Sequence, residues 1–112
     1  MLNTTDLPVP FEVRLEPHRE RLMVVASGEL DLHSADRWEA AVLEQFDSGF
    51  QHVVADLREL SFIDSSGIRV LWRAHQRSER GDTRFSVIPG DGEVSRALRI
   101  TGLLERMHLL ER

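Results

Sequence analysis

The sequence contains no cysteine, which excludes disulfide bonds, thiolate metal sites and cysteine nucleophiles. It also has no excess of positive charge, because 14 basic residues stand against 19 acidic ones and the net charge is -5. Non-specific binding to nucleic acids or to anionic membrane surfaces depends on clustered positive charge, so we expect neither. The lack of thiols fits a reducing compartment, and we expect a soluble protein of the cytoplasm.

Long hydrophobic runs are missing as well. The apolar stretches fall far short of the ~20 residues that a membrane-spanning helix needs, so no membrane insertion is expected. Residues 1–10 contain Asp6 and two prolines rather than a basic segment followed by an apolar one. We therefore expect no signal peptide and interpret 1–10 as a flexible leader. Residues 11–112 are enough for one compact domain and too few for two.

The apolar residues that are present predict four strands. Alternation at Phe11, Val13 and Leu15 and a second apolar run at 22–26 predict a β-hairpin, with a turn at 16–20 around Pro17. The consecutive apolar residues at 53–57 predict a strand buried on both faces. A further strand is predicted at 85–88.

Helical spacing of apolar residues predicts three helices between and after these strands. The first has its apolar stripe at Ala35, Trp38, Val42 and Phe46. Ser34 is expected to cap this helix through its hydroxyl, and Ser48-Gly49 to end it. The second helix is expected to turn Ile68, Leu71, Trp72 and His75 to one side. The third is predicted at 93–100, with a short edge strand somewhere in 103–110.

The predicted order is β-β-α-β-α-β-α. Strands that alternate with helices need crossover connections, which join parallel strands. The opening hairpin adds one antiparallel pair. The fold class is therefore α/β, with a mixed, mostly parallel sheet of about four to five strands and helices packed against it.

The segment Asp64-Ser65-Ser66-Gly67 lies between a strand end and a helix. Serine is a good helix cap, aspartate suits the positive end of the helix dipole, and glycine allows a close approach of the backbone. On local grounds alone this is a well-capped strand-to-helix turn.

The chain as a whole resembles the STAS domain family over roughly residues 11–110. Four segments carry the resemblance, in order: Gly-Glu-Leu-Asp at 28–31, Val-Val-Ala-Asp-Leu at 53–57, Phe-Ile-Asp-Ser-Ser-Gly-Ile at 62–68 and Leu-Arg-Ile-Thr-Gly-Leu at 98–103. Each segment is weak evidence by itself, whereas four in sequence are strong evidence. The resemblance implies the STAS fold for 11–112.

The resemblance further implies an anti-sigma factor antagonist, in which the second serine of the Asp-Ser-Ser-Gly motif is phosphorylated. That position is Ser66, with Ser65 the less favoured choice. The unphosphorylated protein would bind an anti-sigma factor that is also a serine kinase, releasing a sigma factor, and a phosphatase would reverse the modification. The implied partner-binding residues are Glu29, Asp31, Asp64, Ser65, Ser66, Gly67 and Arg69.

The physical logic of such a switch stands independently. A phosphoserine adds about -1.5 to -2 charges, which a helix N-terminus tolerates and an interface fitted to a hydroxyl does not. Asp64 either caps the helix, orients a neighbouring hydroxyl or contacts the partner. Glu29 and Asp31 either flank the same surface or form a solvated strand end. Arg69 pairs with the phosphate, pairs with a partner's acid or is simply solvated.

Other functions find less support in the sequence. The five histidines lack a metal-ligand spacing, and no Gly-x-Ser-x-Gly elbow surrounds either serine, so we expect no metal, no cofactor and no enzyme activity. His75 is expected to pack in a partly buried position. The main alternative is a STAS subunit that acts as a scaffold, without switching, in a stress-sensing or lipid-transport complex. A monomer is the simpler expectation.

Overall fold

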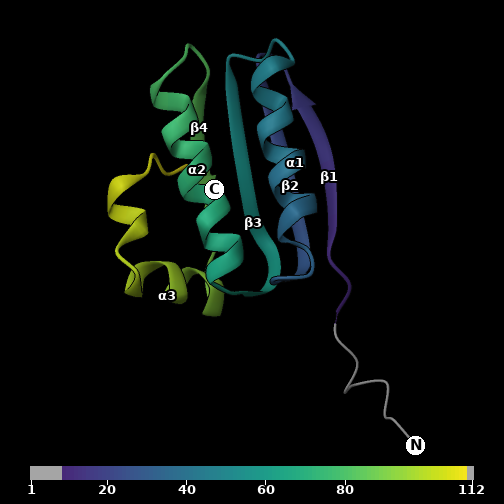
Figure 1. Cartoon of the computed structure of the whole chain (residues 1–112), viewed down its shortest axis with the longest axis vertical. Helices are drawn as coiled ribbons and strands as arrows, with labels where there is room; N and C mark the ends of the chain where they lie inside the picture. The colour runs from purple at the N-terminus through teal and green to yellow at the C-terminus, as the bar shows by residue number, and fades with distance from the viewer. Residues whose placement is uncertain (1–8, 111–112) are drawn as a thin grey trace, which may run out of the picture.

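The structure is a computed structural model that describes residues 9–110. Within this range the chain forms one sheet with the strand order β1-β2-β3-β4 (Figure 1). Its strands are β1 (Glu12–His18), β2 (Arg21–Leu30), β3 (His52–Ile63) and β4 (Arg84–Ile88). The β1–β2 pair is antiparallel and the other two pairs are parallel, which confirms the mixed, mostly parallel sheet.

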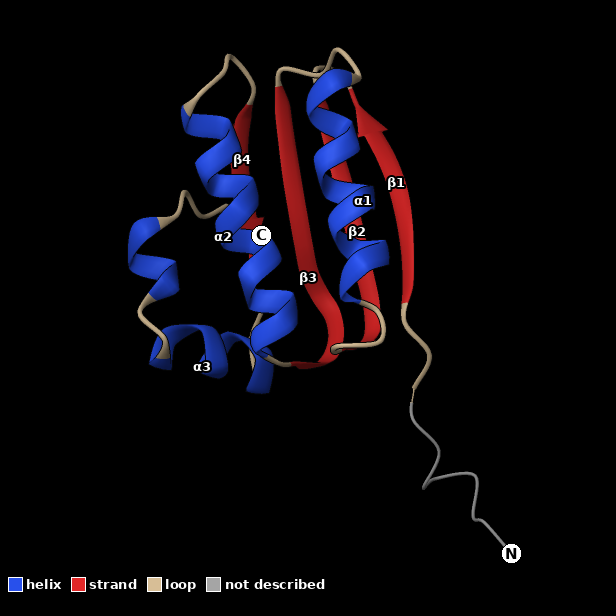
Figure 2. Cartoon of the chain, in the orientation of Figure 1, coloured by secondary structure: helices blue, strands red, loops and turns tan. Residues whose placement is uncertain are grey.

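The helices α1 (Ala35–Leu43) and α2 (Ser65–Glu79) cover one face of this sheet, and α3 (Glu93–Ile100) lies across the end where β3 curves (Figure 2). Short 3-10 helices follow α1 (Glu44–Asp47) and α3 (Leu103–Arg106). The edge strand expected near the C-terminus is reduced to a single bridge between Val87 and Leu109. In the described part of the chain, none of the helices has the length and hydrophobicity needed to cross a membrane.

The hydrophobic core fills the space between the helices and the sheet. Its largest fully buried side chains include Trp38, Leu71, Phe85 and Leu98. The stripe predicted for the first helix is buried, and the strand at 53–57 is buried on both faces, as its sequence indicated. His75 is buried as well, in contact with Trp72.

The opposite face of the sheet, called the open face below, is covered by no helix of residues 9–110 (Figure 2). It holds a small apolar cluster of Met23, Val25, Val54 and Ile88. Leu110, from the segment after α3, packs against this cluster, and its four members are nearly inaccessible to water.

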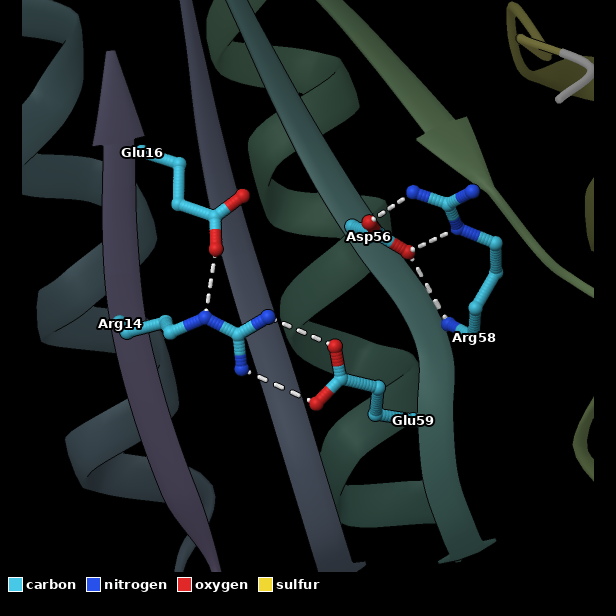
Figure 3. Close-up of polar contacts among 5 residues, drawn as sticks. All are labelled: Arg14, Glu16, Asp56, Arg58 and Glu59. Atoms are coloured by element: carbon cyan, nitrogen blue, oxygen red, sulfur yellow. Dashed lines mark hydrogen bonds and ion pairs between the residues drawn. The ribbon is translucent and has the colours of Figure 1, made fainter.

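Ionic contacts cross the open face (Figure 3). Arg14 on β1 reaches over β2 and donates two hydrogen bonds to the carboxylate of Glu59 on β3, at 3.0 and 2.7 Å. Arg58 pairs with the buried carboxylate of Asp56 at 2.7 Å. Burial alone would raise the pKa of Asp56, but the hydrogen bonds and charge of Arg58 outweigh it and hold that pKa below its usual value.

The predicted turn at 16–20 was wrong in its extent. β1 continues through Pro17 to His18, and the turn is Arg19–Glu20, with Arg19 at a φ of 64°. Proline is tolerated because β1 is an edge strand, where one side of the backbone needs no partner. Leu15, expected to be inward, is 48% exposed, since the helices cover the centre of the sheet rather than this edge.

The strands β2 and β3 are longer than predicted. Each continues beyond its apolar run through polar residues, from Ser27 in β2 and from Arg58 in β3. The β2–β3 ladder contains two register shifts in this stretch, so strict alternation is lost while pairing persists. The extension carries both strands to the start of α2.

Candidate functional site at the start of α2

The ends of β2 and β3 hold the first turn of α2 in place. Leu30 and Ile63 are paired in the ladder, and the Asp64 N–H donates to the Leu30 carbonyl oxygen at 3.1 Å. Because parallel strands end at the same edge of a sheet, Asp31 and Asp64 leave their strands side by side. This carboxyl edge of the sheet is where the predicted site residues come together.

Asp64 is the cap of α2. Its backbone is extended, and its Oδ1 accepts hydrogen bonds from the N–H groups of Ser66 at 2.8 Å and Gly67 at 3.4 Å. Of the three roles left open by the sequence, the geometry supports capping, and no serine hydroxyl of the motif bonds to this carboxylate within residues 9–110.

Ser65 and Ser66 therefore occupy the first turn without being needed to cap it. Ser65 is exposed and Ser66 is half-buried. Neither hydroxyl has a hydrogen-bond partner among the residues that the structure describes. Both oxygens are free to react or to meet a partner without breaking a bond of the fold.

Gly67 sits where α2 approaches the strands most closely. A Cβ atom at this position would lie 2.6 Å from Leu30 Cγ and 3.0 Å from Ile63 Cγ1. Leu30 is fully buried, so an added Cβ would have to displace a side chain of the core. The close approach expected of this glycine is thus confirmed.

Glu29 and Asp31 are half-buried at the end of β2. Asp31 Oδ1 accepts from the His33 N–H at 2.9 Å, and the Asp31 N–H donates to Ser34 Oγ at 3.0 Å. The expected cap at Ser34 was wrong: it occupies the N-cap position of α1, but its hydroxyl turns back to the strand end and makes no cap bond.

Just before Asp31, the β2 chain is closely packed against the segment that leads into β1. Gly28 has a φ of +83°, and a Cβ there would lie 1.9 Å from the Pro10 carbonyl oxygen. The Glu29 N–H donates to the Val9 carbonyl oxygen at 3.3 Å. Val9 and Pro10 therefore run beside the carboxyl edge; the first eight residues of the expected leader lie outside the described range.

Two exposed apolar side chains at this edge were not singled out from the sequence. Leu32, in the loop after β2, is 73% exposed, and Phe62, near the end of β3, is 47% exposed. Leu32 stands between Asp31 and His33, in a polar stretch that belongs to no predicted strand or helix. An apolar residue in such a stretch was the sequence signal that could have revealed it. Arg69 is exposed on α2, with no ion pair within residues 9–110, and its three readings stay open.

Comparison with known proteins agrees with this architecture. The STAS domain model matches residues 12–112. The chain belongs to the STAS domain family. It is 31% identical over 106 residues to an anti-sigma F factor antagonist of Paenibacillus polymyxa, covering 90% of this chain and 87% of that protein. An anti-sigma-B factor antagonist of Staphylococcus aureus is 24% identical over 88 residues, which cover 79% of this chain and 82% of that protein.

Solved structures share the fold. An anti-sigma factor antagonist from Mycobacterium paratuberculosis superposes with a TM-score of 0.80 at 25% identity, covering 89% of this chain and 85% of the other. The anti-sigma factor antagonist SpoIIAA in its unphosphorylated form gives a TM-score of 0.74 at 22% identity, over 90% and 88% of the two chains. The second likeness shows the STAS fold alone.

Proposed function

We propose that this STAS domain is an anti-sigma factor antagonist whose binding is switched off by phosphorylation of Ser66. The observation that carries the proposal is a serine hydroxyl that has no hydrogen-bond partner within residues 9–110, in the first turn of a helix whose cap is a different residue. The antagonist relatives support the general role. The activity proposed is binding to another protein rather than catalysis.

The cap arrangement explains how a phosphate could act on the partner and spare the fold. Asp64 already accepts the N–H groups of Ser66 and Gly67, so a phosphate on Ser66 finds these donors taken. It also meets the negative charge of Asp64, which favours a position turned outward to solvent. The helix keeps its cap, and the added charge lies on the surface.

The surroundings of Ser66 suit a partner that binds the neutral form. Leu32 and Phe62 offer exposed apolar area at the same edge, and Glu29 and Asp31 offer acidic groups for a partner's cations. A hydrated dianion placed in such an interface costs several kcal/mol, enough to release the partner. A phosphoserine phosphatase would restore the binding form.

To test this, the full chain is incubated with its anti-sigma factor kinase in the presence of ATP and magnesium. The intact mass of the chain is then measured. We expect one phosphate on the native chain and on Ser65→Ala, and none on Ser66→Ala. In a binding assay, Ser66→Asp should weaken the complex by at least about tenfold, whereas Ser48→Asp, an exposed serine far from α2's start, should not.

Two outcomes would count against the proposal. A phosphate retained on Ser66→Ala would move the switch to another residue. An unmodified native chain that stays in a larger complex regardless of Ser66→Ala would favour the scaffold alternative.

A further inference from the structure

A second charged feature lies at the other end of the sheet. The ladder pairs His18 with Arg21, Arg21 with His52, and His52 with Arg84. These four residues, one from each strand, form a straight line across the sheet, called the basic row below. Residues paired directly across strands share one face, and the row lies on the open face.

The basic row borders one hollow of about 450 Å³, which Arg19, Glu20 and Gln51 also line. This volume lies within the usual range for small-molecule sites. The hollow is formed by the β1–β2 turn and the first residues of β3 and β4. It therefore lies at the amino end of β3, whereas Ser66 follows its carboxyl end.

The charge of this hollow is strongly unbalanced. Arg19, Arg21 and Arg84 line it together with one carboxylate, that of Glu20. Arg84 also borders a neighbouring hollow, which Glu79 and Asp82 line. None of the three arginines forms an ion pair within residues 9–110. Other arginines of the same range do, among them Arg14, Arg58, Arg73 and Arg77. Like charges at neighbouring positions of a sheet repel, so an anion bound in this hollow would relieve that repulsion.

His52 lies in the middle of the basic row, paired with Arg21 and Arg84. It is buried, and its Nε2 lies 2.7 Å from Ser86 Oγ. Burial, followed by the charges of Arg84, Arg21 and His108, lowers the pKa of His52 to about 4. At neutral pH it is uncharged, so it adds a polar group to the row without adding repulsion.

We propose that the basic row binds an oligophosphate, an anion with two or more linked phosphoryl groups. Guanidinium groups bind phosphate oxygens with paired, charge-assisted hydrogen bonds. Three strand spacings separate the ends of the row, roughly 14 Å, so a linear anion matches it better than one phosphate does. The phosphates could belong to a free oligophosphate or to a nucleotide, and the chemistry on the protein is shared.

The test is calorimetric titration of the full chain, at low ionic strength, with sodium tripolyphosphate, ATP and orthophosphate. We expect tripolyphosphate to saturate one site and orthophosphate to bind at least about tenfold more weakly. Arg21→Gln and Arg84→Gln should each weaken tripolyphosphate binding about tenfold, because each removes a charged donor pair. The control Arg96→Gln, an exposed arginine of α3, should leave it unchanged.

A second measurement does not depend on the variants. In the amide spectrum of the native chain, tripolyphosphate should shift the signals of Arg21, His52 and Arg84 and not those of Ser65 and Ser66. If ATP binds as tightly as tripolyphosphate, the phosphates can come from a nucleotide. If ATP does not bind, the ligand is a free oligophosphate. Absence of saturable binding, or equal weakening by Arg96→Gln, would overturn the proposal. Failure of the Ser66 switch would not affect it.

Discussion

At the scale of single residues, the Asp-Ser-Ser-Gly segment divides its work between fold and surface. Asp64 and Gly67 hold the helix start in place, and the two serine hydroxyls make no bond that the fold needs. The sequence predicted the close approach at Gly67 because few residue types fit such a turn. It failed at Ser34, since a residue type suitable for a cap does not determine where its hydroxyl points.

Gly67→Ala should lower the free energy of unfolding by about 1 to 2 kcal/mol, because overpacking of the added methyl group against Leu30 costs up to about 3 kcal/mol. The gain in helix propensity, about 1 kcal/mol, offsets only part of this loss. Urea unfolding provides the measurement. Gly81→Ala, in an exposed turn, is the matched control and should change little. An unchanged or more stable Gly67→Ala would contradict the packing seen at this point.

Asp64→Ala should cost about 0.5 to 2 kcal/mol of stability, because two backbone N–H groups lose their acceptor. Asp64→Asn keeps an oxygen acceptor and should lose less. Ser66→Ala should leave stability nearly unchanged, since the Ser66 hydroxyl has no hydrogen-bond partner among the described residues. Thermal unfolding of the three variants checks the order, and a Ser66→Ala loss as large as that of Asp64→Ala would refute it.

At the scale of elements, the spacing of apolar residues predicted strands β1 to β4 and helices α1 to α3, but not where the strands end. β2 and β3 continue through Ser27 and Arg58 because ladder pairing, which the side-chain pattern does not record, carries them on. The ionic contacts of the open face were not predicted either. Arg14 and Glu59 are 45 positions apart in sequence, and only the ladder register brings them together.

His52 on β3 forms a hydrogen bond with Ser86 on β4, and it should make the stability of the fold depend on pH. Its pKa is about 4 in the folded chain against an ordinary value of 6.5, so the unfolded chain binds the proton more readily. This difference does not reduce the free energy of unfolding above about pH 6.5. As the pH falls from 6.5 towards 4, it lowers the free energy of unfolding by about 2 to 3 kcal/mol. Urea unfolding at about pH 7.5 and about pH 4.5 should show a smaller loss for His52→Gln than for the native chain. Equal losses would mean that His52 does not resist protonation.

Two of the ion pairs on the open face, Arg58–Asp56 and Arg14–Glu59, should differ in their contribution to stability. Arg58→Met leaves the buried Asp56 carboxylate without its charged partner and should cost about 1 to 3 kcal/mol. Glu59→Gln weakens a contact between exposed groups and should have little effect. Chemical denaturation of both variants measures the two losses of stability. Losses of similar size would contradict the expected difference.

At the scale of the whole molecule, the two proposed sites lie at opposite ends of β3. A strand of 12 residues spans roughly 40 Å, several times the Debye length at physiological salt. Ser66→Asp should therefore leave tripolyphosphate affinity within about twofold of the native value. Titration of both proteins at about 0.15 M salt measures this, and a larger change would reveal coupling through the sheet.

The tight packing of Pro10 against Gly28 bears on how this protein should be handled. The described chain begins at Val9, whose carbonyl oxygen accepts from the Glu29 N–H. A fusion joined directly to Val9 would therefore start beside Glu29. The other terminus leaves the described fold next to β4, where Leu110 donates to the Val87 carbonyl oxygen. A handle placed after this point leaves the contact between Pro10 and Gly28 untouched.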